Sequence, residues 1–131
     1  MGVFHAQVIS VHSARKVKWN SGHAAADERR WHALADHPMV GEAKLVGLMG
    51  SIALTPDKAK RAKFASESGT VGFRTRERCF ANNLIMRHVG DRMIISPPLV
   101  ITPAEIDVLI ERATKSLDES YASLKADGLL V

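Results

Sequence analysis

The sequence predicts an α+β fold, a small two-layer sandwich in which helices pack on one face of an antiparallel or mixed sheet. Three observations lead to this prediction. Short apolar stretches separated by glycine and proline turns are typical of two pairs of strands. A long stripe of apolar residues near the C-terminus has the spacing of a helix. The chain has 131 residues, of which 46% are apolar. This is enough for one domain with a hydrophobic core, but it is short for two domains.

The first elements surround a proline turn. Residues 24–35 are rich in good helix formers and predict a helix. Asp36-His37-Pro38 ends it, because proline disfavours helix in the residue before it. Residues 40–46 and 48–54 predict two antiparallel strands. Val3 to Val11 form a further candidate strand.

The middle of the chain predicts a second helix. Residues 58–69 are polar and predict a loop or a broken helix. A helix is expected over residues 70–81, in which Phe73 and Phe80 are seven residues apart and therefore share one face. Asn83 follows, where a helix end needs a residue that tolerates the left-handed conformation.

A hairpin and a long helix complete the fold. Leu84 to Arg87 and Met93 to Ser96 predict two strands joined by a turn at Gly90-Asp91. Thr102 to Glu105 form a capping box with proline at the first helical position, and Gly128 ends the helix. The apolar stripe of this helix consists of Ile106, Leu109, Ile110, Ala113, Leu117, Tyr121 and Leu124.

Composition argues against several classes of protein. The net charge is +4 and the basic residues are scattered, so a nucleic-acid-binding module is only an alternative. No apolar run approaches the roughly 20 residues of a membrane helix, and the start lacks the pattern of a secretory signal. A single cysteine excludes an internal disulfide framework. We therefore expect a cytoplasmic protein.

Few residues have the spacing of a reactive site. His32 and His37 are five residues apart across a predicted helix end, which is not the spacing of a metal site, and no metal is expected. Cys79 follows Arg76 and Arg78, but no histidine base is placed near it, so we expect a small core residue.

Arg87 is unusual because it ends an otherwise apolar predicted strand. A guanidinium there needs a carboxylate or other acceptors. It can form a structural ion pair with Asp91 across the hairpin, or it can bind the carboxylate of a ligand in a cleft. The residues alone favour the structural pair.

Several stretches together resemble the class III, omega-type aminotransferases, in order and over about three quarters of the chain. The stretches are Leu34 to Glu42, Gly47 to Ile52, Asp57 to Ala59, Leu84 to Asp91, Ile94 to Leu99 and Thr102 to Leu117. The resemblance is to omega-amino-acid:pyruvate and amine:pyruvate transaminases. Two positions depart from the family pattern, since Leu45 and Asn83 each stand where glycine is common.

The resemblance implies that residues 34–131 form the C-terminal small domain of a fold type I aminotransferase, and residues 1–33 match nothing in the family. It also implies that Arg87 swings in to bind the substrate carboxylate and swings out to admit an apolar group. Ser96-Pro97-Pro98 would lie close by and shape the site.

The same resemblance implies pyridoxal phosphate as the cofactor of the full-length family. None of the eight lysines lies in the family's cofactor-lysine context. We therefore expect no catalytic or cofactor-binding residue, and a substrate-recognition domain that is inactive alone. Its expected partners are a large aminotransferase domain and a second copy of the chain. A split enzyme completed by a second chain is the alternative.

Overall fold

The computed structural model describes residues 24–130, so the candidate strand from Val3 to Val11 lies outside the described residues. The elements are α2 (Ala24–Ala33), the 3-10 helix η1 (Leu34–Asp36), β1 (Val40–Val46), β2 (Met49–Leu54), α3 (Thr70–Ala81), β3 (Arg87–Val89), β4 (Arg92–Ile95) and α4 (Pro103–Ala126). The predicted order of helix, two strands, helix, two strands and helix is confirmed. The first predicted helix is split, since its last turn tightens into η1 before Pro38.

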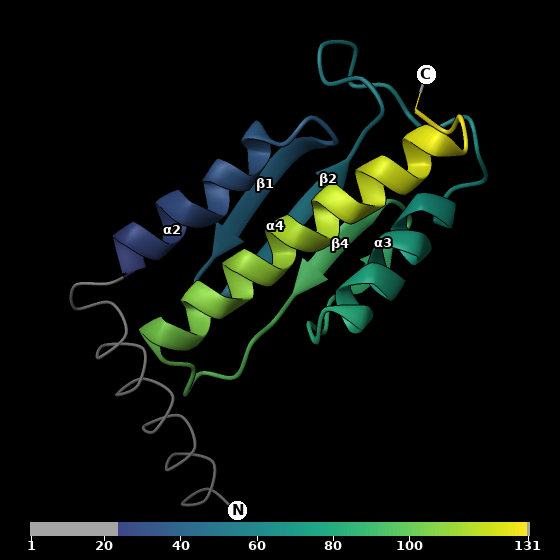
Figure 1. Ribbon diagram of the computed structural model, residues 1–131. Coiled ribbons are helices and arrows are strands. Elements are labelled where there is room, and N and C mark those ends of the chain that lie inside the picture. The colour runs from purple at the N-terminus through teal and green to yellow at the C-terminus, as the bar shows by residue number, and fades with distance from the viewer. Residues whose placement is uncertain (1–23, 131) are drawn as a thin grey trace, which may run out of the picture.

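The four strands form one antiparallel sheet in the order β1-β2-β4-β3. Helices α2, α4 and α3 lie side by side across one face of this sheet (Figure 1). The predicted α+β sandwich is therefore confirmed, and the sheet is antiparallel rather than mixed. No helix within residues 24–130 is long and apolar enough to cross a membrane.

The core lies between the sheet and the helices. Alternate strand residues such as Ile52, Met93 and Ile95 point into it and are buried. Trp31 of α2 is 3% exposed, and its ring nitrogen donates to the carbonyl of Lys44 at 2.8 Å. A Cβ atom at Gly50 would lie 2.5 Å from the Trp31 ring, so only glycine allows the ring to pack there.

The two strands of the second hairpin differ from their predicted ranges. β4 covers Arg92–Ile95 instead of residues 93–96, a shift of one residue. The expected strand from Leu84 to Arg87 is instead β3, which starts only at Arg87. Asn83 adopts the expected left-handed conformation, with φ of 57°, and the Leu84 amide donates to the Cys79 carbonyl at 2.8 Å. This bond belongs to the helix end, so pairing with β4 starts at Arg87↔Ile94.

The two long helices follow their sequence patterns closely. Thr102 and Glu105 form the predicted capping box, and the α4 stripe faces the core. Phe73 and Phe80 share one face of α3 as predicted, but that face is the outer one and both rings are nearly half exposed. The guanidinium of Arg76 lies over both rings, at 5.0 and 5.1 Å from their centroids.

Candidate functional site

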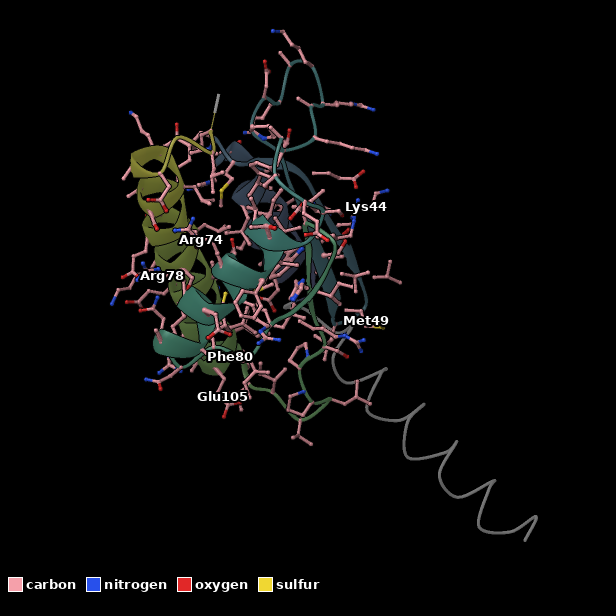
Figure 2. The ribbon with its side chains drawn as sticks, turned by 90° about the vertical axis from the view of Figure 1, so that its right-hand side faces the viewer. Lys44, Met49, Arg74, Arg78, Phe80 and Glu105 are labelled. Carbon is pink, nitrogen blue, oxygen red and sulfur yellow. The ribbon has the colours of Figure 1, made fainter. Side chains whose placement is uncertain are left out.

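The face of the sheet opposite the helices carries most of the polar strand residues. Strand register aligns Lys44, Ser51, Ile94 and Arg87 in one row across it. The next row contains Glu42, Ala53, Arg92 and Val89. We call these two rows, together with Val46 and Met49, the open face. Figure 2 labels Lys44 and Met49 on the side of the sheet away from the helices.

Arg87 begins β3 and is exposed on the open face. It forms no salt bridge with any residue of the described part of the chain, and the expected pair with Asp91 is absent. The Asp91 Oδ1 atom instead accepts hydrogen bonds from the amides of Gly69 and Gly72, at 3.2 and 3.0 Å. That interpretation of Arg87 was wrong because Asp91 caps the start of α3 rather than facing the next strand.

A second guanidinium on the open face is already neutralised. Arg92 donates to Glu42 Oε2 at 2.9 Å and to Ser51 Oγ at 3.1 Å. Glu42 also pairs with Lys44 at 3.0 Å. The hydrogen bond from Arg92, followed by that from Lys44, lowers the pKa of the Glu42 carboxyl. Ala53 lies between Glu42 and Arg92 in the row, and its small side chain lets the two meet across β2.

A pocket of about 820 Å³ adjoins the Glu42 and Arg92 end of the open face. We call it the loop pocket. Its walls come from loop residues between Arg61 and Ser68, from Gly41 and Glu42, from the end of β2 and from residues 89–92. Sequence reasoning missed it because the wall is formed by segments that are far apart in the chain.

The basic cluster before α3 is divided by the fold. Lys58 donates to the carbonyl of Ala35. Lys60 extends into solvent, 3.7 Å from Asp57. Arg61 and Lys63 line the loop pocket. The four side chains therefore have three different surroundings: a backbone carbonyl, open solvent and the wall of the loop pocket.

The other candidates have structural roles. Cys79 is 2% exposed, and burial raises the pKa of its thiol, which confirms the expected core position. Among residues 24–130 no cluster of three potential metal ligands exists. Pro97 turns toward the helices and lines a small apolar hollow with Trp31 and Ile106, on the opposite side of the sheet from Arg87.

The described residues do not fit pyridoxal phosphate. A Schiff base needs a lysine amine beside a carboxylate for the ring nitrogen and a cup for the phosphate. Four lysines of the described part extend into solvent: Lys44, Lys60, Lys115 and Lys125. Lys58 is held by a backbone carbonyl. Lys63 reaches the loop pocket, but Glu42 and Asp91, the carboxylates there, are bound to Arg92 and to the start of α3.

The relatives and solved structures that this chain resembles are aminotransferases. The chain is 52% identical over 99 residues to a putrescine–pyruvate aminotransferase of Pseudomonas aeruginosa, covering 76% of this chain and 21% of that protein. A thermostable omega transaminase mutant from Pseudomonas jessenii superposes with a TM-score of 0.74 at 26% identity, over 87% of this chain and 25% of that one. A PMP-bound aminotransferase from Vibrio fluvialis gives 0.71 at 29% identity, over 76% and 22%. No family model matches the chain.

Proposed function

Because this chain belongs to the class III, omega-type family of pyridoxal-phosphate-dependent aminotransferases and spans about a fifth of the length of the relatives it matches, we propose that it is their C-terminal, substrate-recognition small domain. The parent activity is that of an omega-amino-acid or amine:pyruvate transaminase. The Pseudomonas aeruginosa relative is a putrescine–pyruvate aminotransferase, which supports an amine donor and a keto-acid acceptor. The remainder of the enzyme is a large domain on the same polypeptide or on a second chain.

One observation carries this proposal. Arg87 extends from the open face without a salt bridge to any residue in the described part of the chain, whereas Arg92, in the next row of the same face, is neutralised by Glu42. A guanidinium offers two parallel N–H donors, which match the two oxygens of a carboxylate. Arg87 would therefore bind and orient the carboxylate of the acceptor.

Pyridoxal phosphate supplies the electron sink for transamination when it is bound. Because residues 24–130 do not fit this group, the lysine, the ring-nitrogen carboxylate and the phosphate cup belong to the rest of the enzyme. The role of this chain is then recognition, and we expect the pure chain to give no turnover of putrescine with pyruvate. Turnover that appears only after a large-domain chain is added would support the split form of the enzyme.

The test is a chimeric enzyme. The matching segment of the Pseudomonas aeruginosa aminotransferase is replaced by the segment of this chain, and KM is measured for pyruvate and for an uncharged aldehyde. Arg87→Ala should raise the KM for pyruvate far more, since losing a bidentate carboxylate contact costs about 2–4 kcal/mol. Arg92→Ala is the matched control, because that guanidinium is already paired. Equal effects of Arg87→Ala on both substrates would leave Arg87 with a structural role only.

A further inference from the structure

The loop that forms the outer wall of the loop pocket is held at fixed points. Thr55 Oγ1 lies 2.7 Å from the carbonyl oxygen of Ala62, and the Ala62 amide donates to the carbonyl of Asp57 at 3.1 Å. Phe64 is only 7% exposed and anchors the loop in the core. The backbone on both sides of Lys63 is therefore fixed, so Lys63 is presented to the pocket from a defined position.

The uncommitted charge in this pocket is positive. Both carboxylates of the wall, Glu42 and Asp91, already accept hydrogen bonds from groups of the fold. Arg61 and Lys63 form no salt bridge with another residue of the part of the chain that the structure describes, and both are exposed toward the pocket. Two cationic residues that line one pocket and have no salt-bridge partner there favour an anion.

The rest of the wall is partly apolar and partly hydroxylic. Val89, Ala53 and Phe64 contribute carbon surface, and Val89 is 57% exposed there. Ser66 belongs to the same wall, and its hydroxyl is buried beneath it with no hydrogen-bond partner among the described residues. The volume of about 820 Å³ lies in the range of pockets that hold small molecules.

We propose that the loop pocket binds a small organic anion, with a carboxylate or phosphate head between Lys63 and Arg61 and a short apolar body against Val89 and Ala53. This site is distinct from the carboxylate contact of Arg87, and it does not depend on the proposed aminotransferase role. The same chain then has two separate places for anionic groups on one side of the sheet.

The experiment titrates the 131-residue chain by amide NMR with butyrate, butyl phosphate, inorganic phosphate and 1-butanol. Saturable shifts at Ala62, Phe64 and Gly90 are expected with one of the organic anions and not with butanol. Tighter binding of butyrate assigns a carboxylate ligand, and tighter binding of butyl phosphate assigns a phosphate ligand. If inorganic phosphate binds as tightly as both organic anions, or if no probe saturates, the proposal is overturned.

Matched charge removals on the same loop locate the site. Lys63→Gln should weaken binding by at least about tenfold, since a charge-assisted contact is lost. Lys60→Gln removes the same charge from a side chain that is 82% exposed outside the pocket, and the affinity should change less than about twofold. Arg61→Asn is a second test, because asparagine tolerates the left-handed backbone at φ 49°. Equal weakening by Lys60→Gln and Lys63→Gln would show general attraction to a basic surface and refute the pocket.

Discussion

Both ring nitrogens of His37 have partners within residues 24–130. Its Nδ1 atom accepts a hydrogen bond from the Met39 amide at 3.1 Å, and its Nε2 atom lies 3.2 Å from an oxygen of Asp118. The ring packs edge-on against Tyr121, with centroids 5.7 Å apart. Burial, together with a smaller effect of the Lys58 charge, lowers the pKa of His37 more than Asp118 raises it. Protonation would also break the bond from Met39, because Nδ1 would then carry a hydrogen.

This histidine should make stability fall in mild acid. Because the pKa of His37 is lower in the folded chain, the unfolded chain binds a proton below about pH 6.5 while the folded chain is still neutral at this residue. The free energy of unfolding therefore declines by at most about 1.4 kcal/mol per pH unit as the pH falls. His37→Asn keeps an acceptor at the δ position for the Met39 amide and should flatten this decline in urea unfolding between pH 7 and 5. Asp118→Asn removes the group that raises the pKa and should steepen it. An unchanged slope in His37→Asn would assign the decline to other groups.

Two glycines are required for different reasons: one by close packing and the other by its backbone conformation. A Cβ at Gly72 would lie 2.2 Å from the carbonyl oxygen of Gly90, where the start of α3 meets the β3–β4 turn. Gly72→Ala should therefore cost about 3 kcal/mol of unfolding free energy. Gly128→Ala meets no atom within 4 Å but has a φ of 69°, so it should cost about 1 kcal/mol. Denaturant midpoints of the two variants check the order, and a reversed order would contradict the close contact.

At the scale of one element, α3 depends on a residue outside itself. Its N-cap, Gly69, has no side chain, and its first turn contains no acid. Asp91 from the β3–β4 turn accepts from the amides of Gly69 and Gly72 instead. This arrangement replaces the local cap with a tertiary one, and it joins the helix to the hairpin.

Removal of this cap should weaken the whole domain. Asp91→Ala should lower the free energy of unfolding by about 1–2 kcal/mol, and Asp91→Asn by less, because the amide oxygen still accepts. Asp107→Ala is a control that removes an exposed carboxylate paired with Arg30, and it should cost less than about 0.5 kcal/mol. Urea unfolding measures all three variants. If Asp91→Ala costs no more than Asp107→Ala, the cap contributes nothing to stability.

Elements defined by local signals were predictable, and elements defined by distant partners were not. The capping box at Thr102 and the stripe along α4 are set by neighbours in sequence, so the prediction of α4 was correct. β3 starts where its backbone first pairs with β4, at Arg87↔Ile94. The spacing of apolar residues in the sequence holds no information on this pairing. The alternation at Leu84 and Met86 reflects burial without strand pairing.

The same division holds for the site as a whole. Arg87 could be singled out because a charge in an apolar stretch is visible in the sequence, and its role as a carboxylate contact stays a prediction. The loop pocket could not be found, because Lys63, Glu42 and Asp91 meet only after the sheet forms. Local runs of charge, such as that from Lys58 to Lys63, carry no information on which side chains will share a cavity.

The open face itself leads to the last prediction, which concerns assembly. Val46 and Met49 are 79% and 60% exposed on it, away from the loop pocket, and Figure 2 shows Met49 directed away from the helices. Exposed apolar surface of this kind favours association, and a two-fold dimer buries the same patch twice. We therefore expect the chain to dimerise at micromolar concentration in sedimentation velocity. Met49→Lys should raise the dissociation constant by about tenfold or more, whereas Val108→Lys, on the exposed side of α4, should not. A wild-type monomer, or equal effects of the two lysines, would exclude the open face as the interface.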